Sequence, residues 1–202
     1  MSRVARPRLV VASQNPGKAR EIGRLFPDYE VLSLAGLAPV DFPEEGGDYA
    51  ENARTKALVA ARATGLPCVA DDSGLEVEAL GGAPGPYSAR YGGPGLDDRG
   101  RYEALLGALR DVAPPRRARF VCHAAVATPD GRTALAEGAC RGEILESAHG
   151  EGGFGYDPVF RPEGHQRSMA ELSREEKDAL SHRGRAFEAL RREVAALLGR
   201  DG

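Results

Sequence analysis

The sequence predicts an α/β domain, because short apolar runs typical of buried strands alternate along the chain with segments that carry helix-capping patterns. The strand-like runs lie at 9–13 and 68–70, and the capped segments begin at 48 and 173. At 202 residues, with 42% hydrophobic and 28% charged residues, the chain can bury one sizeable core. We therefore expect a single domain over 1–202.

The first two helices are predicted from their N-terminal signals. Asn15 is the expected cap of a helix that follows strand 9–13, and Pro16 lies in its first turn. Asp48 and Glu51 form a capping-box pattern ahead of an alanine-rich helix. Both helices are thus expected to start just after polar turns.

The strand over 68–70 is predicted to end at a run of polar residues. Ligands of open α/β sheets usually bind at the carboxyl ends of strands, so this run is a candidate site. It comprises Asp71, Asp72, Ser73 and Gly74. The remaining expected elements are a half-buried strand over 75–79, an irregular glycine- and proline-rich loop over 81–95, a helix over 102–109, a hairpin of strands 120–128 and 133–140, and helical structure over 173–199.

Charge and cysteine content limit the function classes. The net charge of -3 gives no global attraction to nucleic acid or to an anionic membrane, so neither is an expected partner. The apolar run after the basic N-terminus is shorter than a signal-peptide core, and no segment approaches the length of a membrane span. Three widely spaced cysteines do not form a metal-type pattern. A cytoplasmic location is therefore expected.

The use of lysine separates candidate functional positions from the background. Of the 27 basic residues, 24 are arginine, and the only lysines are Lys18, Lys56 and Lys177. A lysine ammonium is a compact, flexible point charge that arginine does not replace where a phosphate is gripped in a tight space. The three lysines are thus candidates for phosphate contacts, with chance retention as the alternative.

A polar turn ahead of the first predicted helix is typical of phosphate-binding turns. Backbone amides at a helix N-terminus, a small glycine and a lysine converge where an anion would lie. An ordinary capped helix is the alternative interpretation. The turn is not a Walker A motif, because Ala12 and Ala19 occupy positions where that motif needs glycine and Ser or Thr. Its residues are Ser13, Gln14, Asn15, Pro16, Gly17 and Lys18.

Acidic residues provide a candidate metal site. Asp71 and Asp72, together with Glu44 and Glu45 in a polar loop, supply oxygen ligands of the kind that Mg²⁺ uses around a phosphate substrate. Paired carboxylates also occur in glycosidases, and aspartates in a turn can simply bind backbone amides. The lysines near phosphate-type turns favour the metal and nucleotide hypothesis over the sugar one.

A glycine-flanked loop and a later polar segment are candidates for binding a base. Two aromatic side chains and a carboxylate in the loop are suited to stacking on a base and to hydrogen bonding with its edge. The loop residues are Phe154, Gly155, Tyr156 and Asp157. Lys177, His182 and Arg183 could donate hydrogen bonds to base carbonyl oxygens. A tight turn with a core aromatic, and solvated charges at helix ends, are the alternatives.

Together these segments resemble the inosine triphosphate pyrophosphatase family, also called Ham1-like noncanonical purine nucleotide pyrophosphatases, over essentially the whole chain. The matching blocks, in the family's order, are VVASQNPGKAREI, ENARTKA, ADDSGLEVEALGGAPGPYSARY, GEGGFGYDPVF and AELSREEKDALSHRG. All three lysines fall inside these blocks. The resemblance implies an elongated α/β fold with a central mixed sheet, flanking helices and two lobes around a substrate cleft, and it implies a homodimer.

The resemblance also implies hydrolysis of ITP, dITP and XTP to the monophosphate and pyrophosphate, with Mg²⁺ as cofactor. Asp72 would be the catalytic carboxylate and a metal ligand, and the second metal ligand would be Glu44 or Glu45, since Pro43 stands at a position that is usually acidic. The implied contacts to the phosphates are Ser13, Gln14, Asn15, Pro16, Gly17, Lys18 and Lys56, and Ser73 is a further implied contact to the substrate. The implied contacts to the nucleoside are Phe154, Gly155, Tyr156, Asp157, Lys177, His182 and Arg183. A nucleotide-binding regulator and an enzyme that removes orthophosphate stepwise are the alternative functions.

Overall fold

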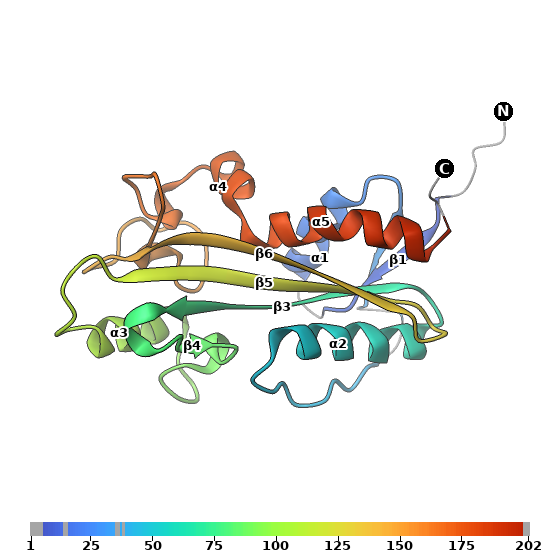
Figure 1. Cartoon of the computed structure of the whole chain (residues 1–202), viewed down its shortest axis with the longest axis horizontal. Helices are drawn as coiled ribbons and strands as arrows, with labels where there is room; N and C mark the ends of the chain where they lie inside the picture. The colour runs from blue at the N-terminus through green and yellow to red at the C-terminus, as the bar shows by residue number, and fades with distance from the viewer. Residues whose placement is uncertain (1–5, 14–15, 35–36, 38, 200–202) are drawn as a thin grey trace. The chain divides into compact units, whose positions relative to one another are not determined.

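The computed structural model describes residues 6–13, 16–34, 37 and 39–199, with 16–18 described as backbone only. Within these residues the chain forms one seven-stranded sheet in the order β2-β1-β3-β5-β6-β7, and β4 pairs with β3 (Figure 1). The strands are β1 (Arg8–Val11), β2 (Glu30–Ser33), β3 (Cys68–Val77), β4 (Pro84–Gly85), β5 (Arg117–Ala127), β6 (Thr133–Ile144) and β7 (Phe160–Pro162). The α-helices are α1 (Pro16–Leu25), α2 (Tyr49–Thr64), α3 (Asp98–Ala108), α4 (Arg174–Leu180) and α5 (His182–Leu197).

The sheet is mixed, which confirms the predicted α/β class with a mixed central sheet. Strand β1 pairs in parallel with β2 and with β3, whereas β3 with β4 and β6 with β7 are antiparallel pairs. The β1–β3 register joins Val10 to Cys68 and Val11 to Val69. Because β1 ends at Val11, the next residues of β3 lie just beyond its carboxyl end.

The chain divides into two compact units, and the first comprises Met1–Asp72, His123–Gly138 and Arg183–Gly202. In this unit α1 and α5 lie on one face of the sheet and α2 lies on the other (Figure 1). Helix α2 presents Ala53, Ala57, Ala60 and Ala61, all fully buried, to the sheet. These small side chains let the helix approach the strands closely, which brings the polar groups of its N-terminal half next to β3.

The second unit comprises Ser73–Cys122 and Ala139–His182. Its core joins the C-terminal part of β3 to α3 through Leu75, Leu105 and Leu109, all fully buried, and it also includes Phe120 and Phe160, whose rings lie 4.6 Å apart. A long loop of this unit, between β6 and β7, carries four of the predicted base-binding residues, Phe154, Gly155, Tyr156 and Asp157. Within the described residues no helix is both long and apolar enough to cross a membrane.

The N-terminal ends of α2 and α4 agree with the sequence prediction, whereas α3 begins at Asp98, four residues before the predicted start at 102. Glu51 N–H donates to the side chain of Asp48 at 3.1 Å, which caps α2, and Gly65 ends the helix in the left-handed conformation with a φ of 67°. Ser173 and Glu176 form the predicted capping box of α4. The helical structure predicted over 173–199 is two helices, α4 and α5, because the chain leaves helical geometry at Ser181.

Strand β3 differs from the prediction. It does not end before Asp71 but continues as one strand from Cys68 to Val77, so the predicted strand over 75–79 is its second part, followed by a short 3₁₀ helix. The two aspartates remain in the strand because buried partners neutralise them, as described below. The sequence prediction also missed β2, a strand of four residues.

Candidate functional site

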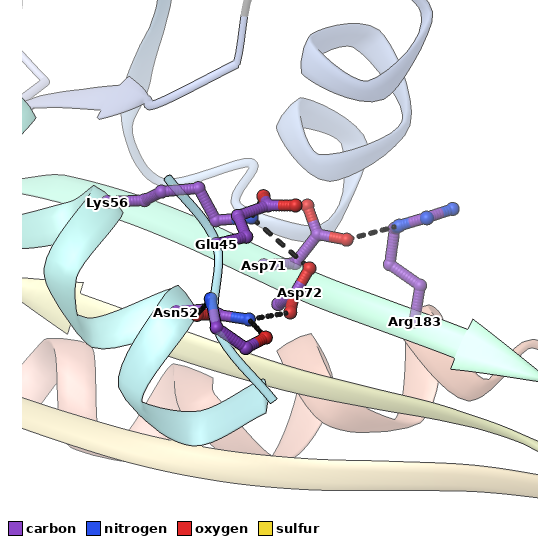
Figure 2. Close-up of polar contacts among 7 residues, drawn as sticks. Glu45, Asn52, Lys56, Asp71, Asp72 and Arg183 are labelled. Atoms are coloured by element: carbon purple, nitrogen blue, oxygen red, sulfur yellow. Dashed lines mark hydrogen bonds and ion pairs between the residues drawn. The ribbon is translucent and has the colours of Figure 1, made fainter. Parts of the chain in front are cut away.

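Two of the predicted metal ligands, Glu45 and Asp72, converge on the ammonium of Lys56, on α2. Lys56 Nζ donates to Glu45 Oε1 at 2.8 Å and to Asp72 Oδ1 at 3.3 Å (Figure 2). The side chains of Lys56 and Asp72 are 14% and 9% exposed, and that of Glu45 is 38% exposed. One cation therefore holds two carboxylates that are distant in sequence at one partly buried point.

Asn52 completes this cluster from one turn earlier on α2. Its Nδ2 donates to Asp72 Oδ2 at 2.8 Å, so each carboxylate oxygen of Asp72 accepts a hydrogen bond from the helix (Figure 2). Residues four apart lie on the same face of a helix, which is why Asn52 and Lys56 reach the same carboxylate. The orientation of Asp72 is thus set by two donors.

The charges of the cluster shift one another's pKa values. Burial raises the pKa of Asp72, and the nearby Glu45 adds to this effect, while Lys56 and the hydrogen bond from Asn52 oppose it; the net direction is upward. Burial of Lys56 disfavours its charge, but Asp72 and Glu45 outweigh this and raise the pKa of the ammonium. Asp72 is therefore a stronger base than a solvated aspartate, next to a lysine that stays charged.

Asp71 has a separate partner set. Arg183 Nε, at the start of α5, donates to Asp71 Oδ2 at 3.1 Å, and Arg183 Nη1 donates to Glu21 Oε2 of α1 at 3.3 Å. The side chains of Arg183 and Asp71 are only 5% and 3% exposed. This buried network joins β3, α1 and α5 within the first unit. The predicted contact between Arg183 and a nucleoside stays a prediction, and the geometry gives Arg183 a structural role.

In the second unit the structure brings together Phe154, Asp157 and Lys177. Asp157 Oδ2 accepts from Phe154 N–H at 2.9 Å and also from Lys177 Nζ, and the ammonium lies 4.8 Å from the centre of the Phe154 ring. Gly153, with a φ of 78°, lies so close to the carboxylate of Asp157 that a β-carbon would collide with it. Phe154 itself is 60% exposed, so its ring is available for stacking.

Three other predicted base contacts, Gly155, Tyr156 and His182, have partners within the second unit. Tyr156 is 5% exposed, and its hydroxyl donates to the carbonyl of Ser88 at 2.8 Å, so this ring packs in the core. Gly155 N–H donates to Asp98 at 2.8 Å. His182 stacks on Phe120 with 5.0 Å between ring centres. Of the two loop aromatics, Phe154 is thus the one that can meet a ligand without unpacking the core.

The predicted phosphate turn lies only partly within the described residues. Gln14 and Asn15 lie outside them, and Pro16, Gly17 and Lys18 are described only as the first turn of α1. Ser13 is half-buried and lies two residues after Val11, the last residue of β1. Ser73 follows Asp72 within β3. Helix α1 begins at Pro16, which agrees with the predicted position of this proline in the first turn.

Comparisons with known proteins identify the family of this chain. The model of the Ham1 family matches residues 9–193. The chain belongs to the Ham1 family. It is 52% identical over 183 residues to a dITP/XTP pyrophosphatase of Deinococcus deserti, covering 90% of this chain and 86% of the relative.

Two further matches cover nearly all of this Ham1-family chain. A dITP/XTP pyrophosphatase of Streptomyces avermitilis is 48% identical over 198 residues, which cover 95% of this chain and 99% of the relative. The structure of the Staphylococcus aureus Ham1 protein aligns with a TM-score of 0.86 at 42% identity, covering 94% of this chain and 99% of that one. The likeness therefore extends over both compact units.

The donor set of the Ham1-family chain fits Mg²⁺ in one of its usual modes. Among the described residues, no group of three or more His, Cys, Asp or Glu side chains is placed to hold a metal. Mg²⁺ commonly binds through one or two carboxylates together with substrate phosphates and waters. Glu45 and Asp72, which share Lys56, offer such a pair. Glu44 is exposed, and Glu45 is the neighbour that reaches the cluster.

Sequence reasoning missed two residues of this region. Asn52 was not singled out, although an asparagine inside an alanine-rich helix is a signal, because asparagine is a poor helix former that is kept where its side chain has a partner. Glu21, which contacts Arg183, gave no such signal, since charged residues are ordinary on the surface of a helix.

Proposed function

We propose that this chain hydrolyses noncanonical purine nucleoside triphosphates, namely ITP, dITP and XTP, to the nucleoside monophosphate and pyrophosphate. The observation that carries the proposal is the partly buried ammonium of Lys56, which binds both Asp72 and Glu45, in a member of the Ham1 family. Relatives that match nearly the whole chain are named dITP/XTP pyrophosphatases. By removing such nucleotides from the pool, the enzyme prevents their incorporation into DNA and RNA.

Asp72 is the proposed catalytic carboxylate. Hydrolysis between the α- and β-phosphates needs an attacking water in line with the leaving pyrophosphate, and phosphoryl transfer requires little covalent help from a protein. A carboxylate with a raised pKa, held by Lys56 and Asn52, can orient this water and accept its proton. Lys56, with Lys18 from the predicted phosphate turn, neutralises negative charge on the phosphate oxygens.

We propose Mg²⁺ as the cofactor, held by Asp72 and Glu45. Glu45 is favoured over Glu44 because its carboxylate already lies within hydrogen-bond distance of the lysine that binds Asp72. Bound Mg²⁺ neutralises charge on the phosphates and on the leaving group. The two carboxylates and Lys56 together determine where the triphosphate chain can lie.

Selectivity for 6-oxopurines follows from hydrogen-bond complementarity. Phe154 provides an exposed aromatic face for the base, and Lys177 and His182 are the candidate donors to its 6-oxo oxygen. An adenine would present an amino group to such donors and leave them unpaired, which disfavours ATP. Guanine retains the 6-oxo group, so its rejection requires an unfavourable contact with its 2-amino group.

A cytoplasmic homodimer is part of the proposal. Cys68, Cys122 and Cys140 are buried and are not joined in disulfides, which fits a reducing compartment. The dimer rests on the resemblance to the family, and sedimentation velocity at micromolar concentration tests it directly. A single species of twice the chain mass of 21.4 kDa is expected.

The enzymatic proposal is tested by incubating the purified protein with Mg²⁺ and ITP, XTP, dITP, GTP or ATP in turn, and separating the products by ion-exchange chromatography. We expect monophosphate and pyrophosphate from ITP, dITP and XTP, with GTP and ATP nearly unchanged. Diphosphate and orthophosphate from every substrate would overturn the proposal in favour of stepwise phosphate removal. Binding of ITP without turnover would favour a regulatory nucleotide-binding protein.

A further inference from the structure

Asn52 uses its carboxamide in three hydrogen bonds at the N-terminal end of α2. Nδ2 donates both to Asp72 Oδ2 at 2.8 Å and to the carbonyl oxygen of Gly46 at 2.9 Å, and Oδ1 accepts from Gly46 N–H at 2.9 Å. The residue is 8% exposed. Figure 2 shows the side chain between the loop and β3. All these groups belong to the first unit.

The carboxamide of Asn52 pairs with Gly46 as a second peptide group would, because it presents one donor and one acceptor to the backbone of the same residue. We call this pair of hydrogen bonds the Asn52–Gly46 bridge. Gly46 directly follows Glu45, so this bridge limits the movement of the loop next to the Glu45 carboxylate. The second hydrogen of Nδ2 goes to Asp72. Aspartate and leucine lack the two donors, and a serine hydroxyl has only one. Only a carboxamide satisfies all three partners.

Asn52 therefore connects the two carboxylates through a route that does not depend on Lys56. Glu45 and Asp72 carry like charges, and Lys56 attracts both of them. Without Asn52 the loop would lose both hydrogen bonds at Gly46 and would depend more on Lys56, a long side chain that loses conformational freedom when it binds. The entropic cost of ordering the loop would then be added to the free energy of binding a cation between the two carboxylates.

We propose that Asn52 is a positioning residue that holds Glu45 and Asp72 at the spacing needed to bind Mg²⁺ before the ion arrives. This inference rests on the proposed function, in which these two carboxylates hold the ion. Asn52 does not touch the substrate; it acts through the loop at Gly46 and through Asp72. Its loss should weaken Mg²⁺ binding far more than binding of the nucleoside part of the substrate.

The variants Asn52→Ala and Asn52→Leu remove all three hydrogen bonds, and Leu also keeps most of the side-chain volume. Arg54→Ala is the matched control, because Arg54 lies on the same helix, is 39% exposed and pairs only with Glu51 among the ion pairs of the described residues. We expect the half-saturating Mg²⁺ concentration for ITP hydrolysis to rise about tenfold in both Asn52 variants. The KM for ITP at saturating Mg²⁺ should change less than about twofold, and Arg54→Ala should match the parent protein.

A second measurement is independent of turnover and of metal. Exchange of the Gly46 amide hydrogen with deuterium, followed by nuclear magnetic resonance without Mg²⁺ or nucleotide, reports the bond to Asn52 Oδ1 directly. We expect protection in the parent protein and in Arg54→Ala, and exchange about tenfold faster in the Asn52 variants.

The outcomes separate the inference from the proposed function. Parent protein that hydrolyses no ITP would overturn the proposed function, whereas a protected Gly46 amide would still establish the bridge. An unprotected Gly46 amide in the parent protein overturns the inference even if neither Asn52 variant folds. The inference is also overturned if the Asn52 variants fold and their half-saturating Mg²⁺ concentration is unchanged. It is overturned as well if the KM for ITP rises by the same factor as the half-saturating Mg²⁺ concentration.

Discussion

Asp71 and Asp72 are neighbours in the sequence, but their carboxylates point to opposite faces of β3 and accept hydrogen bonds from different side chains. Asp71 pairs with Arg183 of α5, and Asp72 pairs with Lys56 of α2. Successive side chains of a strand alternate between its faces, and in the first unit α2 lies on the face opposite to α1 and α5 (Figure 1). Asp71 is therefore tied to the packing of α5 against β3, and Asp72 is the aspartate to which we assign the catalytic role.

Replacing Asp72 by asparagine should abolish most turnover and leave the fold intact. The amide keeps the shape of the carboxylate but cannot accept a proton from water, so kcat for ITP should fall roughly 10³-fold. Asp28→Asn is the control, because this carboxylate is 74% exposed and pairs with Arg191 at 3.8 Å. Steady-state kinetics at saturating Mg²⁺ measures the effect. A kcat within about threefold of the parent value would show that another group serves as the base.

Replacing Asp71 by asparagine should reduce the stability of the fold more than it reduces turnover. The change leaves Arg183 buried with a weakened set of partners, and removal of one member of a buried ion pair destabilises a protein by about 3 kcal/mol. Urea unfolding measures this loss, and kcat should fall far less than in Asp72→Asn. Glu30→Gln is the control, since its pair with Arg8 is exposed and should contribute less than about 1 kcal/mol. Equal losses in the two variants would contradict the structural role of Asp71.

Removal of the Phe154 ring should affect substrate binding without affecting stability. The side chain is 60% exposed, so Phe154→Ala should change the free energy of unfolding by less than about 0.5 kcal/mol. Loss of base stacking should raise the KM for ITP roughly tenfold. Tyr87→Ala is a matched control, because Tyr87 is 47% exposed and also has a cation, Arg90, 4.9 Å from its ring centre. Similar KM values for both variants and the parent protein would remove Phe154 from the base site.

The local features of the site could be predicted from the sequence, and its long-range pairs could not. The cap at Asp48 and the candidates Asp72, Lys56 and Phe154 each follow from residue type and immediate neighbours. The pairing of Asp71 with Arg183 joins positions 112 residues apart, and no local pattern encodes which of 24 arginines meets this carboxylate.

Strand β3 shows why the sequence prediction placed the end of a strand at Asp71 and Asp72. Aspartate is depleted in strands, so two aspartates after a short apolar run indicate a turn. In the structure the strand continues through them, because Arg183 on one face and Lys56 with Asn52 on the other satisfy both carboxylates. Tertiary partners thus outweigh the intrinsic preference of the residue, and those partners come from two helices that the local sequence of β3 does not reveal.

The buried thiol of Cys68 should make stability fall at alkaline pH. Burial raises the pKa of Cys68 to about 11, above the ordinary value of 9.0. A group whose pKa is higher in the folded state stabilises that state fully below the unfolded value, and this contribution is lost as pH rises through the folded value. The folded protein should therefore lose stability between about pH 9 and pH 11.

Urea unfolding at intervals across this pH range measures the loss of stability, with Cys68→Ala as the reference in which the other titrating groups are retained. The parent protein should lose more stability than the variant over the same range, because only the parent must bury a thiol that the unfolded chain ionises. Parallel curves for the two proteins would mean that the thiolate of Cys68 is as well accommodated in the fold as in water.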